Sequence, residues 1–276
     1  MAEITAAAVK ALRERTGLPM MDCKRALQEA AGDEDAAIEL LRKAGKKSME
    51  KRSGRETSFG RIAVHAEPAA GVGAIIELLC ESAPVTANEE FLELAAALAR
   101  QLATGPGAST PDELLEQPSP SRAGQTLKQQ FEDLNHRIRE VFRLPRIARI
   151  DASCGGYVHH DGSTGVLLQI EGDNAELAKD ICMHVAAMRP AVVAKEDLDP
   201  ELVDKEREIL TEAALKEGKP EKIVPKMVEG RLRNFYAEHC LNEQPFVKEE
   251  KQTVGKVAQA GGIKVVSFIR WEVGKE

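Results

Sequence analysis

The sequence has no excess of positive charge. Its 276 residues include 45 acidic and 38 basic side chains, which gives a net charge of −7 and a pI of about 5.6. This balance argues against a general nucleic-acid-binding surface, so we expect no direct nucleic-acid partner. One local basic run, KAGKKSMEKRSGR at residues 43–55, is compatible with a basic patch or with a solvated linker, and we favour the linker.

Long apolar runs and paired cysteines are also missing. No apolar run approaches the roughly 20 residues that cross a bilayer, and the N-terminal MAEITAAAVKALRER is charged and periodic, unlike a signal peptide. The cysteines are odd in number, scattered and without a CxxC pair, which argues against a disulfide framework and a zinc site. We therefore expect a cytoplasmic protein without membrane association. The cysteines are Cys23, Cys80, Cys154, Cys182 and Cys240.

Recognisable catalytic signatures are absent as well. The GVG at 71–73 precedes a strand rather than a helix, so it is no phosphate-binding loop. His159 and His160 are adjacent on a predicted strand and point to opposite faces, and the Asp-Gly after them predicts a hairpin turn, so a metal site is not expected. Cys80 and His65 could form a thiol–imidazole pair, but a buried cysteine at the end of an apolar strand is usually a small hydrophobe. The sequence favours a protein that binds a partner, without a cofactor.

Residues 1–45 are predicted to form three short helices. Thr5 can cap the first helix, Gly17 suits its end, Asp22 can cap the second helix, and Gly45 can close the third.

Met20 and Met21 lie in the turn between the first and second predicted helices. A module of this size has a marginal core, and methionine either fills such a core or forms an adaptable binding surface. Both interpretations are open at this point.

The core contains one α/β unit twice, each time in the order hairpin, strand, helix. Gly73 aligns with Gly165, and Asn88 aligns with Asn174, so the first copy carries six extra residues at 82–87. Because function often resides in loops on a rigid scaffold, this loop is a candidate site.

His184 aligns with Leu98 of the first copy, so a polar side chain replaces an apolar one. It can be a hydrogen-bonded core histidine or a contact to a partner.

The remaining segments complete the predicted organisation. The Gly-, Pro- and Ser-rich stretch 104–125 is the best boundary in the chain, and the sequence ends in a strand with alternating apolar positions. Residues 196–241 predict two antiparallel helices in coiled-coil contact, with Leu202, Ile209 and Ala213 facing Ile223, Met227, Leu232 and Phe235. The predicted domains are 1–45, 46–143, 144–195, 196–241 and 242–276.

The chain contains, in this order, the segments MAEITAAAVKALRERTGLPMMDCKRALQEAAGDEDAAIELLRKAG, MHVAAMRP, KMVEGRLRNFY, QPFV and VVSFIRWEVG. These segments, and their order, resemble the bacterial translation elongation factor Ts family. The resemblance implies an α+β fold with an N-terminal three-helix ubiquitin-associated-like module, a core of two related α/β subdomains and an inserted antiparallel helical (coiled-coil) hairpin. It also implies a guanine-nucleotide exchange factor, without covalent chemistry, that binds the GTPase elongation factor Tu and promotes GDP release during translation elongation.

The resemblance also implies which residues touch the partner. In the family, a Cys-Glu/Gln-Thr-Asp-Phe-Val motif ends the strand; its Phe wedges into an apolar pocket near the magnesium site of the GTPase, and its Asp works beside it. Here Ala83 and Pro84 replace that Asp and Phe, between Ser82 and Val85. Other matching contacts are Arg13, Met20, Met21 and His184.

In an exchange factor of this family, the 196–241 hairpin would make further contacts with the partner or self-associate. Two alternatives to exchange stay open from the sequence. The chain could hold elongation factor Tu without accelerating exchange, or it could be a cysteine-dependent enzyme that uses Cys80.

Overall fold

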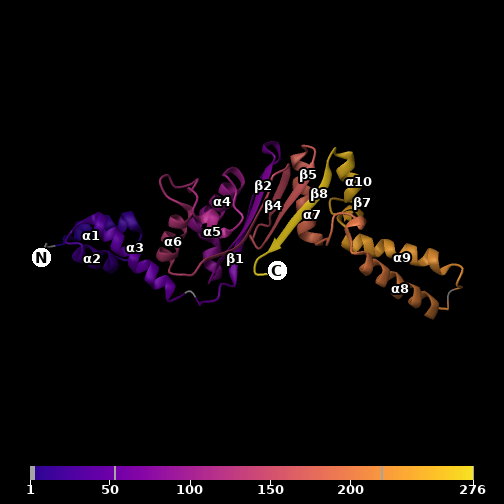
Figure 1. Ribbon diagram of the computed structural model, residues 1–276, viewed down its shortest axis with the longest axis horizontal. Helices are drawn as coiled ribbons and strands as arrows, with labels where there is room; N and C mark the ends of the chain where they lie inside the picture. Colours follow the sequence, from indigo (N-terminus) through magenta and orange to yellow (C-terminus); the bar gives the residue numbers. More distant parts are fainter. Residues whose placement is uncertain (1–3, 53, 219, 276) are drawn as a thin grey trace. The chain divides into compact units, whose positions relative to one another are not determined.

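The computed structural model describes residues 4–52, 54–218 and 220–275. Figure 1 follows the chain through its helices and strands. Within these ranges no helix combines the length and the apolar character needed to cross a bilayer.

The chain packs into two compact units. Unit 1 comprises the residues up to Ala63, together with Ile76–Ile147 and Val273–Lys275. Unit 2 comprises Val64–Ile75 and Ala148–Glu272.

Unit 1 begins with three helices, α1 (Ala6–Thr16), α2 (Met20–Glu29) and α3 (Glu34–Glu50). The Thr5 hydroxyl accepts a hydrogen bond from the Ala8 N–H at 3.2 Å, and Gly17 ends α1 with φ +68°, as the sequence predicts. Their small shared core consists of Val9, Leu12, Leu18, Cys23, Ala26, Leu27, Ala37 and Leu41.

Two sequence predictions in this module are wrong. Asp22 does not cap α2, because that helix already begins at Met20 with Pro19 before it. Gly45 does not end α3, which continues to Glu50. A Cβ at Gly45 would lie 2.5 Å from His136 Nδ1, so this glycine permits a close approach of α3 to α6 instead of forming a cap.

The strands of the first sheet lie in the order β1 (Phe59–Glu67), β2 (Val72–Cys80) and β3 (Arg143–Ile150). A 3-10 turn, η1 (Pro68–Ala70), and Gly71 with φ +65° join β1 to β2. The sheet contributes residues to both units.

The helices α4 (Glu89–Thr104), α5 (Pro111–Leu115) and α6 (Leu127–Ile138) complete unit 1. The stretch 104–125, which the sequence suggests as a boundary, lies inside this unit. Its α5 packs against α4 and α6. The Gln117 side chain donates to the Gly107 carbonyl at 2.6 Å, so local hydrogen bonds hold the Gly- and Pro-rich segment in place.

Unit 2 contains an antiparallel sheet in the order β4 (Cys154–Val158), β5 (Thr164–Glu171) and β8 (Lys264–Glu272). Helix α7 (Ala175–Met188) packs on β4 and β5 (Figure 1). Asn174 caps α7 by accepting from the Leu177 N–H, and Asn88 caps α4 in the same way from Phe91 and Glu90. The two copies of the predicted repeat therefore share the same helix start.

Helices α8 (Pro200–Lys216) and α9 (Val224–His239) form the predicted antiparallel hairpin (Figure 1). The predicted seam is partly wrong, because Leu202, Ile209 and Ile223 are about half exposed. Ala214, one position beyond the predicted Ala213, is fully buried, and a shift of one residue rotates the buried face by about 100°. The seam consists of Leu210, Ala214, Val224, Val228, Leu232, Phe235 and Tyr236.

Short elements after the hairpin complete the core of unit 2. They are η4 (Leu241–Glu243), β6 (Pro245–Phe246), β7 (Glu249–Thr253) and α10 (Val254–Ala260), and η3 (Lys195–Asp197) precedes the hairpin. Phe246, Val254 and Ala258 pack with residues of β5 and α7.

Candidate functional site

The loop at residues 82–87 follows β2 in unit 1. Residues Ala83–Ala87 form a 3-10 turn, η2, which leads directly into the cap of α4. Ala83 and Pro84 are exposed, whereas Val85 is buried. The Thr86 hydroxyl donates to the Ala83 carbonyl at 2.8 Å, and Arg61 donates to the Thr86 carbonyl at 3.3 Å. The loop therefore presents a two-residue tip, Ala83-Pro84, above a buried anchor.

Ser82 holds the beginning of this loop through all three of its hydrogen-bonding groups. Its N–H donates to Glu140 Oε2 at 3.1 Å, and its hydroxyl donates to Glu140 Oε1. Its carbonyl accepts from the Cys80 thiol at 3.4 Å. Both oxygens of one carboxylate thus bind one serine.

Glu81 makes the reciprocal contact: its carboxylate binds the backbone N–H of the residue after Glu140, as the Glu140 carboxylate binds that of the residue after Glu81. Its Oε1 accepts from the Val141 N–H at 2.7 Å, and its Oε2 lies 3.0 Å from the Arg55 guanidinium. Burial alone would raise the pKa of Glu81, but the Val141 N–H, Arg55 and Arg52 outweigh it and hold the pKa below its ordinary value. The carboxylate is therefore charged at neutral pH.

The Cys80 thiol is poorly suited to nucleophilic chemistry. Burial, and after it the nearby Glu140 carboxylate, raise the pKa of Cys80 to about 12. Because the thiolate is the reactive form, almost none of this side chain would be reactive near neutral pH. The observation speaks against the cysteine-dependent enzyme.

The His159-His160 segment forms the tight turn that the sequence predicts. The Gly162 N–H donates to the His159 carbonyl at 2.8 Å with φ +76° at Gly162, and Val158 pairs with Gly165. Across 4–52, 54–218 and 220–275 no group of three or more His, Cys, Asp or Glu residues has an arrangement that could hold a metal ion.

The N-terminal module exposes Met20 and Met21. Met20 is 50% exposed and Met21 is 62% exposed, so neither fills the core of the module. Arg13 is also exposed, on α1. Asp22, next to Met21, pairs with Arg139 at 2.9 Å, which ties the beginning of α2 to the end of α6.

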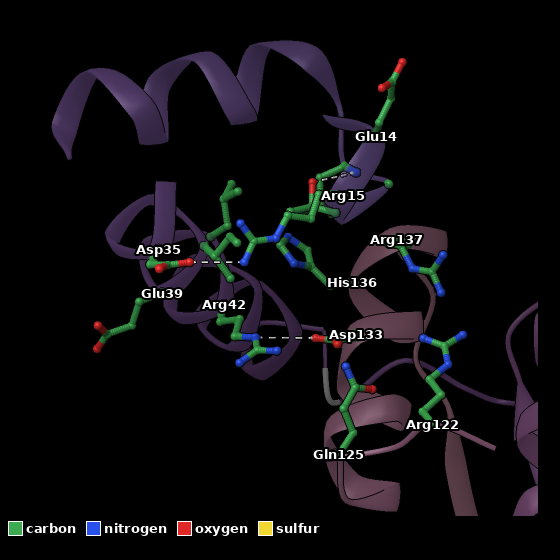
Figure 2. Close-up of a pocket in the computed structure, with 15 residues that line it drawn as sticks. Glu14, Arg15, Asp35, Glu39, Arg42, Arg122, Gln125, Asp133, His136 and Arg137 are labelled. Atoms are coloured by element: carbon green, nitrogen blue, oxygen red, sulfur yellow. Dashed lines mark hydrogen bonds and ion pairs between the residues drawn. The ribbon is translucent and has the colours of Figure 1, made fainter. Parts of the chain in front are cut away.

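A cavity of about 620 Å³ lies between α1 and α3 on one side and α6 on the other (Figure 2). Arg42 Nε lies 3.9 Å from Asp133 across it, and Figure 2 shows His136 between the two groups of helices. Burial is the main reason why the pKa of His136 is lowered. Charges of both signs line the cavity, so it has no clear preference for an anionic or a cationic ligand. The charged lining comprises Glu14, Arg15, Asp35, Glu39, Arg42, Arg122, Asp133 and Arg137.

His184 lies in the core of unit 2 with no exposed surface. Its Nδ1 accepts from the Val247 N–H at 3.3 Å, so Nε2 carries the proton and donates to Gln244 Oε1 at 2.8 Å. Burial lowers the pKa of His184. The ring therefore fixes the segment 244–247, in which Val247 is 44% exposed.

The residues that secure the loop were not identified from the sequence. Glu140 lies 58 positions from Ser82, and no local pattern marks the pair. The turn after α6 places Arg139 on Asp22 and the next residue, Glu140, on Ser82. Within unit 1, one turn thus contacts both the methionine end of α2 and the loop 82–87.

The comparisons with known proteins agree with one another. The family model described as "Elongation factor TS" matches residues 84–275. A protein of Thioalkalivibrio sulfidiphilus named "Elongation factor Ts" is 41% identical over 275 residues, which cover 99% of this chain and 92% of that protein. Proteins of the same name from Methylococcus capsulatus and Aquifex aeolicus are each 42% identical, over 99% and 96% of this chain and over 92% and 96% of their own lengths.

Proposed function

Since this chain belongs to the elongation factor Ts family, we propose that it binds elongation factor Tu and promotes GDP release from it during translation elongation. The observation that carries the proposal is the similarity over nearly the whole chain, including the N-terminal module. The protein acts by binding and forms no covalent intermediate. An exchange factor accelerates release only if it binds the nucleotide-free GTPase better than the nucleotide-bound one.

The N-terminal module would make the docking contact with Arg13, Met20 and Met21. The exposure of both methionines supports this role, because methionine side chains adapt to an apolar partner surface. Their place at the start of a helix tied through Asp22 to Arg139 keeps the contact in a fixed orientation within unit 1.

The loop 82–87 would press on the nucleotide site through its tip. Burial of a Phe is worth roughly 1.5–3 kcal/mol, and Pro84 offers only part of that apolar area. A deficit of about 2 kcal/mol corresponds to roughly 30-fold in affinity for the nucleotide-free state. Pro84 and the hydrogen bonds of Ser82 and Thr86 stiffen the loop, so less ordering is required on contact. Val85 would act as the buried anchor of the tip.

His184 would act through the segment that it holds. With no exposed surface, its ring reaches a partner only if the segment 244–247 moves. The exposed Val247 next to it is the better direct contact, and His184 sets the position of that residue.

The alternative is a binder that holds elongation factor Tu and leaves the GDP dissociation rate unchanged. The observation that favours it is the absence of the Asp and Phe side chains at the loop tip. The exposed apolar face of Leu202, Ile209 and Ile223 supports a further role of the hairpin in self-association.

The deciding experiment is GDP dissociation from the cognate elongation factor Tu, followed with a fluorescent GDP. The wild-type chain is compared with the double variant Ala83→Asp/Pro84→Phe and with no addition. Strong acceleration by the wild type, with little further gain in the variant, supports exchange through the present loop. Tight binding without acceleration, together with acceleration by the double variant, supports the binder.

A further inference from the structure

One carboxylate controls the start of the loop 82–87. Glu140 accepts two hydrogen bonds from Ser82, one from the backbone and one from the side chain. Hydrogen bonds to an ionised acceptor are about twice as strong as neutral ones. Glu140 is only partly buried, so it lies near the surface at which the tip Ala83-Pro84 is presented.

The backbone that carries Glu140 is itself held on several sides. Arg139 has φ +65°, a left-handed conformation that few residues other than glycine adopt. Its N–H donates to the Asn135 carbonyl at 2.8 Å, and its own carbonyl accepts from Arg52 at 2.6 Å. On the other side, the Val141 N–H donates to Glu81. Surrounding contacts thus fix an uncommon turn whose next side chain reaches the loop.

We propose that Glu140 is a positioning residue for the loop 82–87, which it holds in the orientation that delivers Pro84 to the nucleotide site of the GTPase. This inference rests on the proposed function and deepens it. Glu140 contacts neither nucleotide nor metal in this role; it acts through Ser82.

The geometry predicts which kinetic quantity depends on Glu140. Ordering a mobile loop on contact opposes binding, and the tip is required at the step in which nucleotide leaves. Docking through the N-terminal module does not use Glu140. Loss of the carboxylate therefore lowers the maximal rate of GDP release at saturating exchange factor, while the half-saturating concentration stays nearly constant.

The variants separate the two hydrogen bonds. Glu140→Gln keeps the shape but replaces one acceptor oxygen with a donor, and Glu140→Ala removes both acceptors. Ser82→Ala removes only the hydroxyl bond, whereas Ser82→Thr keeps a hydroxyl and should restore function. Glu132→Gln, an exposed glutamate on α6, is the matched control.

For Glu140→Ala we expect a maximal rate about tenfold lower, which is about 1.4 kcal/mol, with the half-saturating concentration changed by less than about threefold. Ser82→Ala should lose less, while Ser82→Thr and Glu132→Gln should match the wild type. An unchanged maximal rate in Glu140→Ala overturns the proposal, as does a loss confined to the half-saturating concentration.

A second readout does not depend on exchange. All five native cysteines are buried, so Ala83→Cys supplies an accessible thiol at the loop tip for a nitroxide spin label. The label should be more mobile when Glu140→Gln is added, and equal mobility overturns the positioning role. If the wild-type chain leaves GDP release unchanged, the proposed function is overturned, and so is the role of Glu140 in exchange. The spin label then reports separately whether Glu140 anchors the loop.

Discussion

The same substitution, glycine to alanine inside a helix, should have opposite effects at two positions of this chain. Gly45 lies within α3, and Gly230 lies within α9. A Cβ at Gly45 would lie 2.5 Å from Nδ1 and 2.7 Å from Cγ of His136, whereas a Cβ at Gly230 would meet nothing within 4 Å. The helix preference is the same at both positions, so the difference isolates the contact between α3 and α6.

The magnitudes follow from two opposing effects. Alanine is better than glycine in a helix interior by about 0.8–1.0 kcal/mol. Forcing extra atoms into a packed contact costs typically about 1–3 kcal/mol. The His136 ring borders open cavities, so it can turn partly away, and the cost at Gly45 should fall in the lower half of that range. We expect Gly230→Ala to stabilise the protein by about 0.5–1 kcal/mol, and Gly45→Ala to be destabilising by up to about 1 kcal/mol.

Urea unfolding followed by helical circular dichroism measures the free energies. Because the chain has two compact units, amide hydrogen exchange of α3 peptides should accompany it to report local stability. A double-mutant cycle supplies the decisive control: in a His136→Ala background the obstacle is gone, and Gly45→Ala should then stabilise by about 1 kcal/mol.

Two results would refute this reasoning. If Gly45→Ala stabilises the wild-type protein as much as Gly230→Ala does, α3 does not pack closely on α6 in solution. If His136→Ala leaves the effect of Gly45→Ala unchanged, the obstacle is some other group.

Two further predictions concern buried polar groups. Glu77 is nearly buried in β2, where its carboxylate accepts from Arg146 Nε at 2.7 Å and from the Gly274 N–H at 2.8 Å. Glu77→Gln should lower the unfolding free energy of unit 1 by about 2 kcal/mol and speed hydrogen exchange at Gly274. Glu171 forms an exposed ion pair with Lys264 at 3.3 Å, so Glu171→Gln should change stability by less than about 0.5 kcal/mol. Equal losses of unfolding free energy in urea titrations of the two variants would contradict this. Because the folded-state pKa of His184 is lowered by burial, its stabilising contribution is complete above the unfolded pKa of about 6.5 and is lost as pH falls through the folded-state pKa. As pH falls from about 7 to 5, the unfolding free energy of His184→Gln should therefore decrease less steeply than that of the wild type. The two slopes should differ by at most about 1.4 kcal/mol per pH unit, and parallel pH profiles would exclude the effect.

Local chemistry explains why part of the fold was predictable. Thr5, which the sequence predicts as a cap, acts on an N–H group three residues away, so the sequence around it contains the complete interaction. The repeat was also recognisable, because its two copies have the same local order of hairpin, strand and helix. The sequence did not decide whether Met20 and Met21 are exposed, because a methionine that fills the core and a methionine that forms a binding surface can occupy the same positions.

Long-range contacts explain the errors. Gly45 resembles a helix end in sequence, and only the approach of His136 from α6 shows why a glycine is present inside α3. In the hairpin, Ala213 and Ala214 are equally small, so the sequence does not specify which of them faces α9. The pairing of Ser82 with Glu140 depends on where the chain returns after α6.

The two copies of the repeat differ in the connection between strand and helix, and in the first copy contacts hold this connection on both sides of the tip Ala83-Pro84. In the second copy, only Gly172 and Asp173 lie between β5 and the cap Asn174. In the first copy the longer connection is tied by Glu140 at Ser82 and by Arg61 at Thr86, and Val85 is buried between these points. A passive connection would need none of these contacts, because a longer surface loop is tolerated at little entropic cost. The contacts instead hold the loop on both sides of the tip, and the Thr86 hydroxyl also binds the Ala83 carbonyl, whereas the Ala83 and Pro84 side chains stay exposed. In the proposed function, Ala83 and Pro84 in place of the motif's Asp and Phe would change what the tip touches, whereas the hydrogen bonds at Ser82 and Thr86 would still direct it.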